Sequence, residues 1–113
     1  MPIYKTYKGA RLDLEIYQGK STIDYEIAVF TDDGSDFDFS VYSSIVFKIF
    51  YRLHGEEILT PNATTSNSTL LLDLTKAQTL GLQTREYWYE VYGILTNPVS
   101  EQELIVYGNL KNV

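Results

Sequence analysis

The sequence predicts an all-β fold: an antiparallel, immunoglobulin-like β-sandwich of about seven strands with one short helical turn near residues 75–81. Three observations predict it. Apolar and polar residues alternate along most segments, turn-forming residues separate these segments, and a single segment begins like a helix. A chain of 113 residues has the size of one domain and buries roughly two-thirds of its unfolded surface. We therefore divide it into a basic N-terminal arm at residues 1–11 and a single β-sandwich domain at residues 12–113.

The predicted strands are the segments in which apolar residues recur at every second position. Such a row places one face of a strand on the core and leaves the other face to water. One strand, around Phe47, also has apolar residues on its second face and is expected to be covered on both sides. The predicted strands cover residues 12–16, 23–29, 45–53, 70–74, 87–95 and 104–110.

Turn residues separate these strands. Gly, Asn and Asp accept the positive φ that tight turns require, and Pro fixes φ and cannot donate to a sheet. The segment at 61–67 is polar throughout, and we interpret it as a loop rather than a strand. The predicted turns and loops lie at residues 18–21, 31–36, 53–56, 61–67 and 97–98.

One short helix is expected after the leucine-rich strand. Thr75 can serve as its N-cap, and Gln78, three residues later, completes a capping box. Gly81 can end the helix in the left-handed conformation. Leu80 and Leu82 would then pack this turn against the core.

Composition excludes several classes of function. The chain carries 9 basic and 15 acidic residues, a formal charge of −6, and no Cys. A nucleic-acid partner is excluded because no basic face can neutralise phosphates, and no apolar run has the ~20 residues of a membrane helix. Disulfides and thiolate ligands are absent, and we expect no cofactor.

Basic residues are concentrated at the N-terminus. Lys5, Lys8 and Arg11 stand in a segment without acidic residues, so the other residues hold 6 basic and 15 acidic side chains, a balance of −9. Such a segment can dock onto an acidic surface, including that of a neighbouring copy. The alternative is a frayed terminus that happens to hold three cations. The docking candidates are Tyr4, Lys5, Tyr7, Lys8 and Arg11.

Sites for chemistry are weakly indicated. The acidic group of Asp32, Asp33, Asp36 and Asp38 could bind calcium through oxygen ligands. It lacks the spacing of an EF-hand, and a solvated hairpin turn explains it. His54, the one histidine, has no neighbours for a metal site or a triad. We predict no metal site, no catalytic residues and no enzyme activity.

Aromatic residues are abundant, with ten Tyr, five Phe and one Trp. Most suit the faces of a sheet. Trp88 and Tyr92 fall on the polar side of their strand, beside Glu90, where exposed rings would form a flat surface. Such a surface suits a glycan or a neighbouring subunit.

The order of these elements resembles the N-terminal domain of the baseplate upper proteins of tailed bacteriophages and related fibre-associated proteins. Those domains run through a Gly-x-Ser/Thr turn, an Asp-Gly loop, a strand of alternating apolar residues, a leucine-rich strand with a Thr/Ser-started helical turn, a Tyr-x-Tyr-x-Val strand and a closing strand with a Gly. The match spans roughly residues 12–113, and its segments lie at 16–22, 30–34, 45–53, 70–78, 87–91 and 106–110.

This resemblance implies a non-enzymatic structural protein of the virion, assembled in the host cytoplasm. It would belong to the head, tail or baseplate, as a collar or fibre component. The expected partners are other virion proteins and copies of the chain itself, with a trimer favoured, and the resemblance carries over no catalytic residues. The alternative is a carbohydrate-binding sandwich that stacks sugars on exposed aromatic rings. A bacterial cell-surface domain is a third reading, disfavoured because no signal peptide opens the chain.

Overall fold

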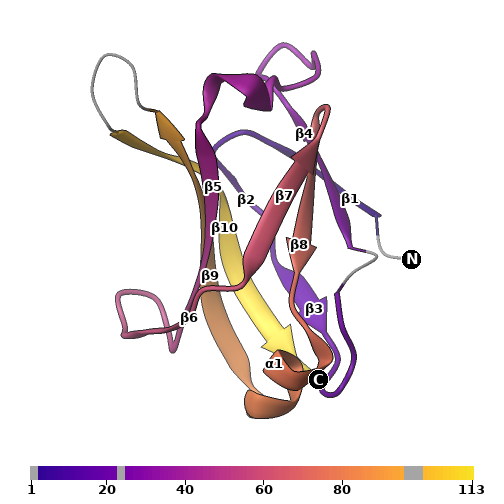
Figure 1. The fold of residues 1–113 in the computed structure, drawn as a ribbon, viewed down its shortest axis with the longest axis vertical. Helices are drawn as coiled ribbons and strands as arrows, with labels where there is room; N and C mark the ends of the chain where they lie inside the picture. The colour runs from indigo at the N-terminus through magenta and orange to yellow at the C-terminus, as the bar shows by residue number, and fades with distance from the viewer. Residues whose placement is uncertain (1–2, 23–24, 96–100) are drawn as a thin grey trace.

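The fold is mostly β. A computed structural model describes residues 3–22, 25–95 and 101–113, and two sheets pack face to face in it (Figure 1). No helix in these ranges is long and apolar enough to cross a membrane. The strands are β1 (Ile3–Tyr7), β2 (Ala10–Arg11), β3 (Leu14–Ile16), β4 (Glu26–Phe30), β5 (Ser44–Phe50), β6 (Glu57–Leu59), β7 (Asn62–Ser66), β8 (Thr69–Asp73), β9 (Glu86–Leu95) and β10 (Glu101–Asn112), with helices η1 (Phe39–Val41) and α1 (Lys76–Gly81).

Both sheets are mixed. The four-stranded sheet has the order β1-β4-β8-β7, and the six-stranded sheet has the order β2-β10-β9-β5-β6, with β3 also paired to β10. β1 runs parallel to β4, and β2 and β3 run parallel to β10. The prediction of a wholly antiparallel sandwich of about seven strands is therefore wrong in both respects. The N-terminal segment and the strands β6 and β7 account for the difference, because they add strands that carry no long apolar row.

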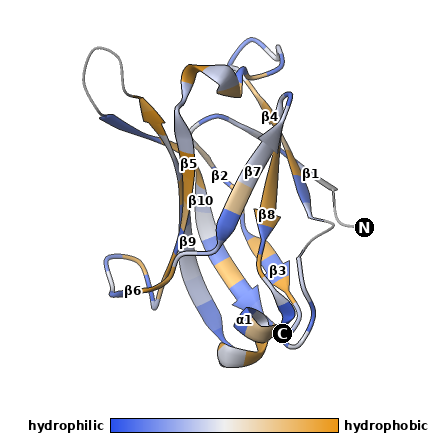
Figure 2. Cartoon of the chain, in the orientation of Figure 1, coloured by the Kyte–Doolittle hydropathy of each residue, from blue (hydrophilic) through white to orange (hydrophobic). Residues whose placement is uncertain are grey.

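The core lies between the sheets and follows the predicted alternation. Ile27 and Val29 of β4 and Phe47 and Ile49 of β5 are fully buried and belong to one core cluster. Figure 2 shows hydrophobic residues along β4, β5 and β8. Tyr89 is also fully buried, and its hydroxyl donates to the carbonyl of Leu12. This hydrogen bond satisfies the one polar atom of the ring, as burial of a tyrosine requires.

The polar segment expected to be a loop is partly a strand. Asn62–Ser66 forms β7, the outermost strand of the four-stranded sheet, and pairs with β8. A two-residue turn joins them, with Asn67 in the left-handed region at φ 57°. The loop prediction is wrong because an edge strand with solvent on its outer side needs no apolar row, and Thr favours extended backbone.

The predicted helix is present as α1. Thr75 Oγ1 accepts a hydrogen bond from Gln78 N, and Gln78 Oε1 accepts one from Thr75 N, which completes the capping box. The C-terminal prediction is wrong, since Gly81 belongs to the helix and Leu82 follows in extended conformation. Leu82 is buried as expected, but Leu80 is 55% exposed. A residue from β10 takes over the capping role that was assigned to glycine.

Asn112, near the C-terminus, is that residue. Its Nδ2 lies 3.3 Å from the carbonyl of Thr79, 3.2 Å from that of Leu82 and 3.2 Å from that of Gln83. The last carbonyls of a helix have no partner inside the helix. Asn112 supplies donors to them and fixes α1 to the end of the sandwich. Two sequence features lie outside the described residues: Ile23, expected to begin a strand, and the turn expected at residues 97–98.

Candidate functional site

The basic N-terminal segment is part of both sheets. β1 pairs with β4 so that Lys5 lies opposite Ala28 and Tyr7 opposite Phe30. After β1, Gly9 N donates to Ile105 O at 2.7 Å, and the chain then joins β10 as β2. Residues 3–11 thus cross from one sheet to the other and hold them together, so they form no free arm and no frayed end. Their docking role remains a prediction about side chains on fixed strands.

On the four-stranded sheet, the docking candidates divide between the core and the surface. Tyr4 packs against Tyr25, with ring centroids 6.2 Å apart, and burial raises its pKa. Lys5 is exposed, and Tyr7 is 53% exposed beside Phe30, at a centroid distance of 6.4 Å. Tyr7 and Lys5 are therefore the members of the set that can meet a partner on this face.

The other two candidates have partners within the chain. Lys8 Nζ lies 3.4 Å from Glu103 Oε1, and Arg11 Nε lies 3.0 Å from Asp13 Oδ1. The pKa of Asp13 is lowered, first by the backbone N–H of Asn109 and then by Arg11. The structure therefore does not gather the five candidates into one patch, because β1 and β2 belong to different sheets.

Arg11 lies over the outer face of the six-stranded sheet, the face that carries Trp88 and Tyr92. Its guanidinium carbon stands 5.5 Å from the centre of the Trp88 ring. Tyr107 packs on Trp88 with ring centroids 5.7 Å apart, and Phe50 of β5 lies opposite Trp88 in the sheet register. The aromatic face, as we call this surface, consists of Arg11, Lys48, Phe50, Trp88, Glu90, Tyr92 and Tyr107.

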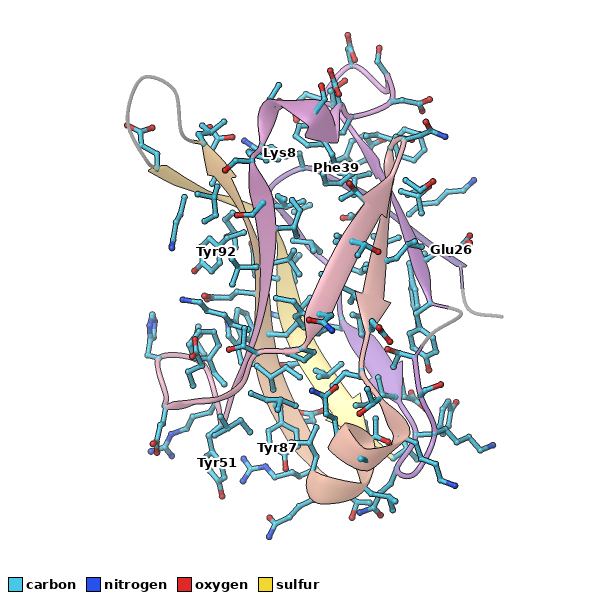
Figure 3. All side chains as sticks on the ribbon, viewed as in Figure 1. Lys8, Glu26, Phe39, Tyr51, Tyr87 and Tyr92 are labelled. Carbon is cyan, nitrogen blue, oxygen red and sulfur yellow. The ribbon has the colours of Figure 1, made fainter. Side chains whose placement is uncertain are left out.

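Trp88 is only 7% exposed. The chain's own side chains therefore cover the ring that was expected to be exposed. That expectation is wrong for Trp88, because alternate side chains on an outer face still bury one another when they are large. Tyr92, by contrast, is half-buried and points away from the sandwich (Figure 3). The two rings do not form an open platform for sugar stacking.

Glu90 fixes the aromatic face. It accepts a hydrogen bond from Trp88 Nε1 at 3.0 Å and another from the Tyr92 hydroxyl. Burial, followed by the hydrogen bond to Glu90, raises the pKa of Tyr92 to about 12. Lys48 Nζ lies 5.9 Å from the centre of the Tyr92 ring and 3.5 Å from Glu57. These contacts hold the rings in single orientations, which suits a rigid protein contact surface.

A groove that the sequence did not indicate lies at the end of the sandwich, between β6 and α1. It has a volume of about 470 Å³. Ile58 is 39% exposed and Tyr51 is 43% exposed on its walls. Tyr51 and Ile58 flank the turn predicted at residues 53–56, but their sequence positions do not indicate that they lie beside α1. The end groove is lined by Tyr51, Ile58, Leu59, Gln78, Gly81, Leu82, Gln83 and Tyr87.

The acidic loop is a structured turn. Asp33 accepts hydrogen bonds from the hydroxyl of Thr31 and from Ser35 N, and these bonds lower its pKa to about 2. Asp38 caps η1 by accepting from Ser40 N at 2.9 Å. Within the described ranges, no three His, Cys, Asp or Glu side chains are placed to hold a metal ion. Asp33 and Asp38 therefore have backbone or hydroxyl partners within the chain.

Comparison with known proteins does not assign the chain to a family. No protein-family model matches the chain, and no curated protein matches it. The functional argument therefore rests on the surfaces described above.

Proposed function

We propose that the chain is a non-enzymatic structural protein of a tailed-phage virion, that it acts by oligomeric assembly and docking, and that its sandwich is of the immunoglobulin-like type. The elements behind the phage resemblance support this. β4, β5, β8, α1, β9 and β10 follow one another in the order that those domains have. The function would be to present fixed surfaces to other virion proteins and to further copies of itself.

The open edge of β7 is the observation that carries the proposal. In its hairpin with β8, Ser66 is paired with Thr69 across the two-residue turn. Residues that flank such a turn exchange hydrogen bonds, and the bonding alternates along the pair. The backbone groups of Ala63 and Thr65 therefore point away from β8, toward the outside of the sheet. No further strand pairs with this side of β7 among the described residues.

This edge lacks the devices that prevent pairing with another chain. Natural edge strands are usually very short, charged, interrupted by Pro or bulged. β7 has five residues, none of them charged or Pro, and its pairing with β8 has no register shift. A protein that works as a monomer would be expected to protect such an edge from pairing. The unprotected edge of β7 therefore supports a role in which a neighbouring chain covers it.

β1 forms the other edge of the same sheet and offers a matching partner. β1 is parallel to β4, β4 is antiparallel to β8, and β8 is antiparallel to β7. β1 and β7 therefore run in the same direction, and each has five residues. When β7 of one copy pairs with β1 of the next, the contact repeats head to tail and can close into a ring. A cyclic trimer is the assembly that we propose.

Native mass spectrometry of two matched variants tests this. Thr65 lies on the same side of β7 as Ala63, which packs against the core, so Thr65→Lys puts an inward-pointing charge on the edge. Thr64→Lys puts the same charge on the outer face. We expect a trimer for the wild type and for Thr64→Lys, and a monomer for Thr65→Lys. Tagged wild-type and Thr64→Lys proteins should enter phage particles, and Thr65→Lys should not.

A monomeric wild type would overturn the assembly proposal. So would equal behaviour of the two lysine variants, because the charge would then act without regard to the edge. Thermal unfolding of both variants shows whether either substitution disturbs the fold itself.

A further inference from the structure

Arg85 is held in a fixed position beside the end groove. Its guanidinium carbon lies 3.8 Å from the centre of the Tyr51 ring and 5.3 Å from that of Tyr87. Its Nε donates to Glu86 O at 3.1 Å, and its Nη2 lies 3.4 Å from Tyr51 O. Stacking and backbone hydrogen bonds thus immobilise a side chain that usually samples many rotamers.

This arrangement leaves donors of Arg85 without a carboxylate. A guanidinium has five N–H groups in a planar fork, and the two backbone contacts use two of them. Arg85 forms no ion pair with a carboxylate among the described residues, unlike Lys8, Arg11 and Lys48. An immobilised, half-buried arginine with an open donor pair matches a carboxylate in bidentate geometry.

The end groove supplies the rest of a small-ligand site. Its volume of about 470 Å³ falls within the range of about 300–1,000 Å³ for ligand pockets. Tyr51 and Ile58 provide apolar surface, and the amide side chains of Gln78 and Gln83 provide polar groups at the same groove. Figure 3 shows Tyr51 and Tyr87 side by side at this end of the sandwich. Arg85 is not part of the lining but lies at the margin of the groove, against the lining residues Tyr51 and Tyr87. An apolar wall and two amides with a cation at the margin fit a ring that carries hydroxyls and a carboxylate.

We propose that the end groove binds an acidic sugar: a pyranose ring that bears a carboxylate. Arg85 would pair with the carboxylate, Tyr51 and Ile58 would contact the apolar face of the ring, and Gln83 would bond to its hydroxyls. Arg85 decides in favour of an acidic ligand, because a neutral sugar would leave its remaining N–H donors without a charged partner. The site is separate from the β7 edge and does not depend on assembly.

Titration of the purified full chain, followed by amide NMR shifts, tests this site. The probes are sodium glucuronate and sodium N-acetylneuraminate, with glucose as the neutral control and an acidic peptide as the non-sugar control. Arg85→Gln removes the charge stacked on Tyr51. Arg52→Gln removes the charge of an exposed arginine in the nearby β5–β6 turn that, among the described residues, is stacked on neither groove tyrosine. Gln83→Leu keeps the Arg85 stack and removes one amide. Unfolding curves establish that each variant is folded.

We expect at least one acid probe to shift the amides of Gln78, Leu82 and Gln83, with affinity that falls as salt is added. Arg85→Gln should weaken binding by about 10- to 150-fold, since a charge-assisted pair contributes about 1.5–3 kcal/mol. Arg52→Gln should leave binding unchanged, and Gln83→Leu should weaken it even where Arg85→Gln fails to fold. The proposal is overturned by absence of groove shifts, by equal binding of glucose, or by an acidic peptide that binds as well as the sugars.

Discussion

Gly93 lies directly beneath the ring of Tyr42. We therefore expect Gly93→Ala to destabilise the wild-type protein but to stabilise a variant that lacks this ring. A Cβ atom at position 93 would lie 2.6 Å from three atoms of that ring. The ring is 9% exposed and its centroid is 5.9 Å from that of Phe37. Its hydroxyl donates to Glu103 Oε1 at 2.8 Å. Tyr42 cannot move away from a methyl group without loosening both contacts.

The size of the effect follows from three contributions. Overpacking a filled core costs about 1–3 kcal/mol, and weakening the Tyr42 hydroxyl bond costs about 1 kcal/mol. Replacing Gly in a strand by Ala contributes about 0.5–1 kcal/mol in the stabilising direction. Gly93→Ala should therefore lower the free energy of unfolding by about 2 kcal/mol. In a Tyr42→Ala background the ring is absent, and the same change should raise it by about 0.5–1 kcal/mol.

Urea denaturation of the wild type, both single variants and the double variant measures this coupling, expected at about 3 kcal/mol. Gly81→Ala is the matched control, because a Cβ atom there would meet no heavy atom within 4 Å. It should be neutral or slightly stabilising. If Gly93→Ala lowers stability equally with and without the Tyr42 ring, the contact is not the cause and the reasoning is refuted.

Three further predictions concern single side chains. Asn112→Leu should lower the free energy of unfolding by about 2–3 kcal/mol in urea titrations, because buried carbonyls at the end of α1 lose their donor; a loss below about 0.5 kcal/mol would contradict the capping role. Asp33 has a lowered folded pKa of about 2, so its stabilisation is present above the unfolded value of 3.8 and is lost as pH falls toward 2. The melting temperature of Asp33→Asn should thus be below that of the wild type at pH 6, and the gap should close by pH 2; a constant gap would exclude this linkage. Arg11→Ala should uncover the ring of Trp88, shift its emission to longer wavelength and increase iodide quenching, whereas Lys5→Ala should change neither, and an unchanged spectrum in Arg11→Ala would show that Arg11 does not cover the ring.

Much of the fold was predictable because the pattern of apolar residues within each core strand indicates its conformation. Ile27 and Val29 recur at every second position, and so do Phe47 and Ile49, and each pair is buried in the core as predicted. The start of α1 was also predictable, since a capping box joins residues only three positions apart. Local patterns of this kind depend on backbone geometry that nearby residues set.

The remaining strands were missed because neighbouring strands decide them. β7 contains no apolar row, and its extended form depends on pairing with β8. β1 and β2 are parallel partners of distant strands, and parallel pairing leaves no hairpin signal in the sequence. Likewise, α1 ends where Asn112, thirty positions later in the chain than Leu82, reaches its carbonyls.

The candidate sites show the same division between local and distant information. Trp88 and Tyr92 could be assigned to the outer side of their strand by counting, but the cover over Trp88 comes from Arg11 and Tyr107, on strands far away in the sequence. The end groove depends still more on distant parts of the chain, since β6 forms one side and α1 the other. Arg85 reads in the sequence as an ordinary charged residue before a strand. Its stack on Tyr51, thirty-four positions earlier, is what turns it into an oriented cation, and only the packing of β5 beside β9 brings the two together.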